Sequence, residues 1–295
     1  MTSNPIFRGA ATALITPTNA DGVDYDRFGR LLDWQVESGI DALVIAGTTG
    51  EGSTLSDEEH REVLKYAVER VAGRVPMIAG TGSNDTAYAV SLSRYACELN
   101  YDGLLVVTPY YNKATQNGLI RMYSTIADAV TKPIIMYNVP SRTGVNIEPS
   151  TYLALADHPN IQAIKEANGN ISKIVETAAL VGDKLDIYSG NDDQVVPILA
   201  MGGAGVISVL SNVLPTQTAE MCARFFRGDL AGSAALQCEY MPLIQALFSE
   251  VNPIPVKAAM AAMGWCENYV RLPLTEMEPV HAEKLFGIMR GHGLI

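Results

Sequence analysis

Lys165 is the side chain with the clearest chemical potential, because it stands inside an apolar run typical of a buried β-strand. The run reads Ile161-Gln162-Ala163-Ile164-Lys165-Glu166-Ala167. Side chains alternate between the two faces of a strand, so Ile161, Ala163 and Lys165 are expected to share one face. Burial of an ammonium favours its neutral form and lowers its pKa. A neutral amine is a nucleophile that can form a Schiff base with a carbonyl substrate.

A structural role for Lys165 is the alternative. A lysine near a core can pair with a neighbouring carboxylate, or it can extend its ammonium into solvent from the end of a strand. The decision depends on which other polar side chains gather at the same end of the fold.

Three further strand-like runs end in loops rich in hydroxyl and basic groups. The loops read Gly47-Thr48-Thr49-Gly50-Glu51-Gly52, Thr108-Pro109-Tyr110-Tyr111-Asn112 and Tyr137-Asn138-Val139-Pro140-Ser141-Arg142-Thr143-Gly144. Tyr137 is a candidate proton donor and acceptor, and Thr48 with Tyr111 could pass protons to it. Arg142 could hold a carboxylate through two parallel hydrogen bonds. Any one tyrosine could instead be a core or rim residue with a hydrogen-bonded hydroxyl.

These loops lack the fingerprints of nucleotide-binding and metal sites. No Gly-Lys follows the first loop, and Gly80-Thr81-Gly82 lacks the third glycine and the acidic partner of a dinucleotide site. The histidines are far apart, have no HExxH or CxxC companions and are predicted to be surface or capping residues. We therefore expect no cofactor and no metal. The histidines are His60, His158, His281 and His292.

Short aliphatic runs recur along the chain, each followed by a turn and an amphipathic segment. This is the pattern of βα units around a parallel sheet. Eight such units in about 225 residues predict an α/β fold, the (β/α)8 or TIM barrel, with its active site at the C-terminal ends of the strands. A doubly wound open sheet is the alternative. The predicted strands are Ala10–Ile15, Ala42–Ala46, Met77–Gly80, Gly103–Val107, Ile134–Tyr137, Gln162–Glu166, Asp186–Ser189 and Gly205–Ser208.

The intervening segments have helical periodicity, and the chain becomes helical throughout after Pro215. Tyr25–Glu37 has apolar residues at helical spacing, and Ser56-Asp57-Glu58-Glu59 has the pattern of a capping box. We expect a barrel domain over residues 1–224 and a small C-terminal helical appendage over residues 225–295. The late helices are predicted at Met221–Phe226, Leu230–Phe248, Pro255–Met263 and Glu276–Met289.

Composition narrows the class of protein. The 295 residues are 48% hydrophobic and 18% charged, which is enough to bury a large core. The net charge of -11 and the scattered basic residues argue against nucleic-acid binding. Met1–Ile15 lacks the apolar core of a signal peptide and is interpreted as a first strand.

Two further patterns bear on the compartment. The uncharged stretch Gln194–Ala219 is long enough to span a bilayer, but several Gly, Ser, Asn and Pro residues interrupt it, so it is interpreted as a helix, a turn and a buried strand. The cysteines form no CxxC pair and are typical of reduced, buried thiols, which favours the cytoplasm. They are Cys97, Cys222, Cys238 and Cys266.

Taken in order, the motifs resemble those of the dihydrodipicolinate synthase family over essentially the whole chain. The similarity rests on the loop containing Thr48 and Thr49, the Val-Thr-Pro-Tyr-Tyr-Asn segment that ends at Asn112, and the Tyr137–Gly144 loop. It includes Ile164-Lys165-Glu166-Ala167 and Asn252-Pro253-Ile254-Pro255-Val256-Lys257 as well. The resemblance implies a lyase that condenses pyruvate with L-aspartate 4-semialdehyde in the diaminopimelate route to lysine.

The resemblance also implies a role for each site residue. Lys165 would form the Schiff base with pyruvate, Tyr137 would donate protons, and Thr48 and Tyr111 would complete a proton relay. The remaining residues would bind substrate: Thr49 and the backbone of Ile207 would hold the pyruvate carboxylate, Gly190 would line the pocket, and Arg142 would grip the carboxylate of the semialdehyde.

Two implications concern assembly and regulation. In the family resembled, two dimers form a homotetramer, and Tyr111 would reach into the site of the neighbouring subunit. Regulated members bind L-lysine as a feedback inhibitor, and here Tyr88 stands where an acidic residue would hold the effector's ammonium.

Two rival functions remain open at this stage. One is a related pyruvate-dependent aldolase or lyase acting on a sugar acid, against which Arg142 and the Thr48–Tyr111 relay argue. The other is a catalytically silent barrel that binds a keto acid as a sensor.

Overall fold

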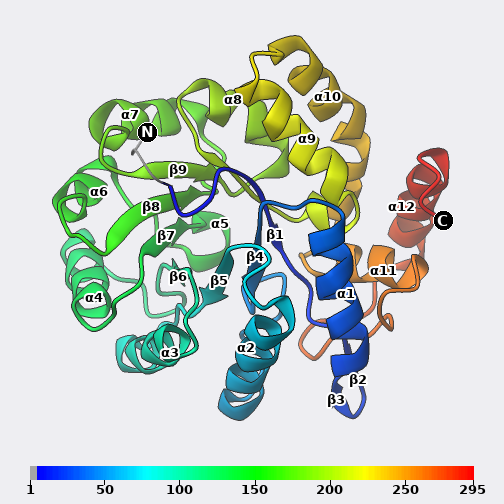
Figure 1. Cartoon of the computed structure of the whole chain (residues 1–295), viewed down its shortest axis with the longest axis horizontal. Helices are drawn as coiled ribbons and strands as arrows, with labels where there is room; N and C mark the ends of the chain where they lie inside the picture. The colour runs from blue at the N-terminus through cyan, green and yellow to red at the C-terminus, as the bar shows by residue number, and fades with distance from the viewer. Residues whose placement is uncertain (1–4) are drawn as a thin grey trace.

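Parallel strands close into a barrel in the computed structural model, which describes residues 5–295 (Figure 1). Strand β1 pairs with both β4 and β10, and this pairing closes the barrel. The predicted fold class is confirmed, and each predicted strand is present with its ends shifted by at most two residues. The barrel strands are β1 (Gly9–Ala13), β4 (Ala42–Ile45), β5 (Met77–Gly80), β6 (Gly103–Val107), β7 (Ile134–Asn138), β8 (Ile161–Glu166), β9 (Asp186–Ser189) and β10 (Gly205–Ser208).

Helices follow the strands and surround the barrel (Figure 1). The helix predicted over Tyr25–Glu37 has those bounds. The predicted capping box is present: Ser56 Oγ accepts from the Glu59 N–H at 3.2 Å, and Glu59 Oε2 accepts from the Ser56 N–H at 3.0 Å. The helices of this layer are α1 (Tyr25–Glu37), α2 (Asp57–Val71), α3 (Thr86–Glu98), α4 (Gln116–Asp128), α6 (Pro149–Leu155), α7 (Ile171–Val181), α8 (Val195–Ala200) and α9 (Pro215–Phe226), and α5 (Pro140–Thr143) is a single turn.

The C-terminal segment is helical, as predicted; its first helix packs against α9, and its later part lies on the side of α1 (Figure 1). It contains α10 (Leu230–Leu247), α11 (Ile254–Ala262) and α12 (Pro279–Gly291). Trp265, just after α11, stacks on Trp34 of α1 with ring centroids 4.5 Å apart. The division of the chain between residues 224 and 225 stays a prediction.

A short hairpin of β2 (Thr18–Asn19) and β3 (Gly22–Val23) was not predicted. Strands of two residues are too short to show an alternating pattern.

Two apolar layers hold the barrel together. Ala11, Val44 and Leu105 belong to the cluster inside the barrel, whereas Leu43 and Ile45 belong to the cluster between strands and helices. Neighbouring residues of a buried strand therefore contact opposite layers, as the pleat requires.

One predicted face was wrong. Ile161 lies in the outer cluster, whereas Ala163 lies inside the barrel. The pairing of β7 with β8 shifts register between Ile134 and Ile135, and an extra residue in a strand reverses the alternation beyond it. Ala163 and Lys165 still share the inner face.

Other predictions have mixed outcomes. The uncharged stretch is α8, a turn and β10, and no helix within residues 5–295 is long and apolar enough to cross a membrane. Cys222 and Cys266 are buried, but Cys238 is exposed, so the prediction of a buried thiol was wrong at Cys238.

His60 is buried rather than at the surface and contacts the Gly80 carbonyl at 2.9 Å. Of Met1–Ile15, residues 1–4 lie outside the described residues, and β1 occupies Gly9–Ala13.

Candidate active site

A cavity of about 150 Å³ opens where the barrel strands end, and most of the predicted site residues line it. Parallel strands place their carboxyl ends at one edge, so loops distant in sequence meet there. The lining residues include Thr48, Thr49, Tyr137, Arg142, Lys165 and Gly190, together with Asn191, Val209, Phe248 and Asn252.

Lys165 lies on β8 with its side chain inside the barrel, only 5% exposed. It pairs in register with Tyr137 of β7, and its Nζ lies 4.1 Å from the centroid of the Tyr137 ring. Burial is the main reason that the pKa of Lys165 is lowered to about 7; the charge of Asp192 opposes this shift and that of Arg142 adds to it. A substantial fraction of the amine is therefore neutral and nucleophilic near neutral pH.

Tyr137 is 6% exposed, and burial raises the pKa of its hydroxyl. Arg142 and a hydrogen bond with Thr48 act in the opposite direction. Tyr137 is thus protonated near neutral pH and has a hydrogen-bonding partner towards the mouth of the cavity. This arrangement suits a group that donates a proton and recovers it.

Asp192 is a buried carboxylate that the sequence gave no reason to choose. Its Oδ2 accepts hydrogen bonds from the N–H groups of Val209 at 3.0 Å and Leu210 at 2.9 Å, just after β10. Burial raises the pKa of Asp192, whereas Lys165 lowers it. The carboxylate therefore interacts with Lys165 through its charge, while its hydrogen bonds go to the backbone and to the Ser208 side chain.

Asn252 is a second residue missed as a site residue, although its segment was part of the motif set. Asn252 Nδ2 donates to Thr49 Oγ1 at 3.0 Å, and its carbonyl oxygen accepts from Arg142 Nη2 at 3.2 Å. One C-terminal residue therefore joins two predicted substrate-binding residues that are far apart in sequence.

Gly190 lies close to Lys165, and the space between them admits no side chain at position 190. A Cβ atom at this position would lie 2.7 Å from Ala167 Cβ and 3.2 Å from Lys165 Cε. The absence of a side chain leaves the lysine room to carry an adduct.

Two predicted residues do not line the cavity. Tyr111 is 93% exposed, with a left-handed backbone at φ 69°. Ile207 lies on β10 with its side chain packed in the inner cluster, and Val209 lines the cavity instead.

A larger cavity of about 620 Å³ adjoins the first and shares Thr48, Tyr137 and Arg142 with it. Asp57 and Tyr88 also line this larger cavity. The Tyr88 hydroxyl is hydrogen-bonded to Asp57, which also forms an ion pair with Arg61 at 2.9 Å.

No group of three or more His, Cys, Asp or Glu residues within residues 5–295 is arranged to hold a metal ion. The expectation of a metal-free and cofactor-free site stays a prediction.

The fold and site together define a (β/α)8 enzyme with a buried lysine poised for carbonyl chemistry. The sequence matches the Dihydrodipicolinate synthetase family over residues 6–290. The 4-hydroxy-tetrahydrodipicolinate synthase of Acetivibrio thermocellus is 52% identical over 291 residues, which are 99% of this chain and 99% of that protein.

Solved structures agree. Dihydrodipicolinate synthase from Aquifex aeolicus has a TM-score of 0.96 at 44% identity, covering 98% of this chain and 99% of that chain. The enzyme of Cyanidioschyzon merolae with lysine bound has a TM-score of 0.95 at 37% identity, covering 99% of this chain and 100% of that chain. The chain therefore belongs to the dihydrodipicolinate synthetase family and is an enzyme of the lyase class, as its motifs predicted.

The lowered pKa of Lys165 leads to a prediction about the free energy of unfolding. The ordinary pKa of lysine is 10.5 and that of Lys165 is about 7 in the folded chain. Between pH 7 and pH 10.5 the unfolded chain binds a proton at Lys165 that the folded chain does not. The lowered pKa therefore reduces the free energy of unfolding by its full amount below pH 7, and this reduction vanishes above pH 10.5. Lys165→Met should therefore raise the free energy of unfolding at pH 6, and this gain should shrink by ~1.4 kcal/mol per pH unit from about pH 7 towards pH 10.

Urea unfolding of the variant and the parent across this pH range measures the difference. Lys184→Met, at an exposed lysine paired with Asp157, is the matched control and should show almost no such slope. A pH-independent gain for Lys165→Met would mean that Lys165 is charged in the folded chain.

Proposed function

We propose that Lys165 forms a Schiff base with pyruvate, and that the enzyme condenses it with L-aspartate 4-semialdehyde to 4-hydroxy-tetrahydrodipicolinate. This is the activity that the names of its relatives carry, and it belongs to diaminopimelate and lysine biosynthesis. The observation that carries the catalytic assignment is the buried Nζ of Lys165 at 4.1 Å from the Tyr137 ring, inside the cavity.

The chemistry follows from a neutral amine beside a proton donor. Lys165 adds to the keto carbon of pyruvate, and loss of water leaves an iminium. Loss of a proton from the methyl carbon gives an enamine, which attacks the aldehyde carbon of the second substrate and regenerates the iminium. The amino group of the second substrate then adds to the iminium carbon, and departure of Lys165 as the free amine closes the ring and releases the product. Tyr137 supplies the proton for the departing water and for the new alkoxide, and its hydrogen bond with Thr48 continues the path outwards.

Carboxylate binding divides between two ends of the cavity. Thr49, held by Asn252, binds the pyruvate carboxylate, and Gly190 leaves room for it. The backbone of Ile207, two residues before the cavity-lining Val209, is the second group that binds this carboxylate. Arg142 stands exposed at the rim, where its guanidinium binds the carboxylate of the semialdehyde.

The rival functions have less support. The family match and the names of the relatives favour the synthase over an aldolase for sugar acids. The low pKa of Lys165 favours catalysis over passive binding of a keto acid, because binding alone needs no neutral amine.

Assembly and compartment are part of the same proposal. The enzyme acts in the cytoplasm as a homotetramer, a dimer of dimers, on small molecules and without nucleic-acid or membrane partners. The exposed, left-handed Tyr111 supports this assembly, because a large aromatic side chain in solvent suits a residue that enters a neighbouring site.

Borohydride reduction in the presence of pyruvate tests the Schiff base. We expect a reduced pyruvyl adduct on Lys165 and on no other lysine, and no adduct in Lys165→Met. Lys257 is an internal control, because it is equally buried but ion-paired with Glu51 at 2.5 Å. Peptide mapping locates the adduct, and active protein modified elsewhere or not at all would refute the assignment.

Arg142→Ala should weaken binding of the semialdehyde. Loss of a charge-assisted bidentate contact costs ~1.5 to 3 kcal/mol, so KM for the semialdehyde should rise roughly ten- to a hundredfold. Trapping of pyruvate on Lys165 should change little, and Arg290→Ala on exposed α12 serves as the control. Equal damage to both substrates would make Arg142 a structural residue instead.

Tyr111 is expected to act in the neighbouring subunit. Inactive Tyr111→Phe and inactive Lys165→Ala chains that exchange subunits would create some sites with both groups intact, so activity should return on mixing. Native mass spectrometry confirms the exchange. A mixed tetramer as inactive as its parents would place Tyr111 in the site of its own subunit.

L-Lysine should inhibit this enzyme weakly. The relative from Cyanidioschyzon merolae was solved with lysine bound, but here Tyr88 offers one neutral hydroxyl that is already bonded to Asp57. A neutral bond in place of a charge-assisted one weakens binding by roughly two- to thirtyfold. Initial rates across a lysine titration into the millimolar range measure the effect, and Tyr88→Glu should increase inhibition. Half-inhibition far below a millimolar in the parent would contradict this prediction.

A further inference from the structure

Glu51 is a buried carboxylate in the loop between β4 and α2, the loop that carries Thr48 and Thr49. It is 3% exposed, its backbone is left-handed at φ 55°, and it does not line either cavity described above. A charged side chain in such a place requires compensation, because burial of an unpaired carboxylate is strongly unfavourable. The reaction itself assigns no role to Glu51.

Lys257 of α11 supplies the compensation. Its side chain is fully buried, and its Nζ lies 2.5 Å from Glu51 Oε1. The same ammonium donates to Thr18 Oγ1 at 2.6 Å and to the Tyr269 carbonyl at 2.8 Å. The ammonium of Lys257 therefore has one ion-pair partner and two hydrogen-bond partners, which together match its three N–H groups in number. Lys257 thus joins the loop, the β2–β3 hairpin and the C-terminal segment at one point.

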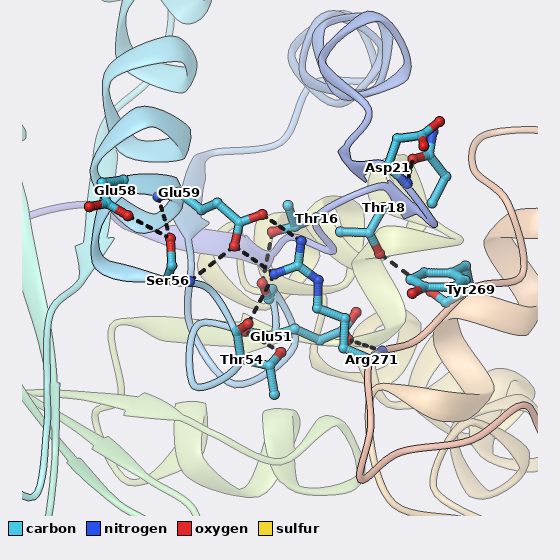
Figure 2. A network of polar contacts seen from close by, with 12 residues as sticks. Thr16, Thr18, Asp21, Glu51, Thr54, Ser56, Glu58, Glu59, Tyr269 and Arg271 are labelled. Carbon is cyan, nitrogen blue, oxygen red and sulfur yellow. Dashed lines mark hydrogen bonds and ion pairs between the residues drawn. The ribbon is translucent and has the colours of Figure 1, made fainter.

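Arg271 binds the part of the same loop that follows Glu51 (Figure 2). Its N–H donates to Glu51 Oε2 at 3.3 Å, and Nη1 donates to the Thr54 carbonyl at 2.9 Å. Its guanidinium also binds Glu59, in the first turn of α2, through two bonds of 2.6 and 2.7 Å. The planar fork matches the carboxylate, so this contact fixes direction as well as distance.

Further hydrogen bonds hold the part of the loop that precedes Glu51. Thr16 Oγ1 donates to the Gly50 carbonyl at 2.8 Å, and Asn252 Nδ2 donates to Thr49 Oγ1 at 3.0 Å. The Glu51 N–H donates to the Thr48 carbonyl at 3.1 Å. The position of Glu51 is therefore transmitted directly to Thr48, whose side chain is bonded to Tyr137.

We propose that Lys257 and Glu51 are positioning residues, which orient Thr48 for proton transfer by anchoring its loop to the C-terminal helical segment. The inference rests on the proposed function, in which Thr48 and Tyr137 move the proton. It gives the C-terminal segment a part in turnover, although that segment supplies no nucleophile.

The test separates positioning from stability. Parent, Glu51→Gln, Lys257→Met, the double variant and the surface control Lys184→Met are compared as full-length enzymes. Borohydride trapping with pyruvate counts the sites that contain a competent Lys165, and kcat is divided by that count. Glu51→Gln keeps the shape of the side chain but leaves the buried ammonium of Lys257 without its carboxylate. The double variant leaves no unpaired buried charge, so it tests the inference even if either single variant does not fold.

We expect Glu51→Gln and the double variant to be trapped as completely as the parent, since β8 holds Lys165. Their kcat per trapped site should fall about ten- to a hundredfold, the loss typical of a misplaced catalytic group. KM for the semialdehyde should stay within about threefold because Arg142 is untouched, and Lys184→Met should match the parent.

A lower melting temperature with kcat per trapped site within about twofold of the parent would overturn the inference and leave the ion pair a structural one. So would full recovery of kcat in the double variant. A parent that pyruvate and borohydride do not label would overturn the proposed function itself, before any variant is compared.

Discussion

The removal of Lys165 from water is the constraint on which the rest of the site depends. A second lysine shows what would happen otherwise, because Lys257 is buried as deeply but has Glu51 at 2.5 Å. Burial lowers the pKa of both side chains, and at Lys257 the adjacent carboxylate opposes the shift directly. At Lys165 the carboxylate of Asp192 bonds to backbone N–H groups, and the nearest aromatic face is that of Tyr137. The same residue type therefore stands without a directly bonded carboxylate in one place and as a paired structural cation in the other.

The barrel makes this difference possible. Neighbouring strands in register bring Tyr137 and Lys165 side by side, and the cluster of apolar residues inside the barrel limits the access of water to the lysine. Gly190, at the end of the next strand, leaves space beside Lys165 Cε that a methyl group would fill. The rigid strands thus fix the nucleophile, while the loops beyond them bring the polar groups that bind substrate.

Much of this was predictable from the sequence, because strand alternation and helix capping are local patterns. The barrel strands, the capping box at Ser56 and the convergence of Tyr137 and Lys165 all follow from residues close together in the chain. The side on which Ile161 packs did not, since the register shift that reverses it depends on the pairing with β7. Asn252, Lys257 and Arg271 each depend on a partner more than two hundred residues away, and no periodicity of the sequence reports such contacts.

The exposed Tyr111 shows why the chemistry and the assembly belong to one argument. Its left-handed backbone costs on the order of 1 kcal/mol for a residue other than glycine, and such strain persists where the surroundings require it. Within one subunit the Tyr111 side chain is almost fully exposed, so its contacts there offset little of the strain. Contacts with a neighbouring chain that buries the ring would offset the strain. The phenol would then reach a proton path that ends at Thr48, which lines the larger cavity. On the proposed function, the single barrel holds the nucleophile and its proton donor, and a contact between two barrels would complete the relay.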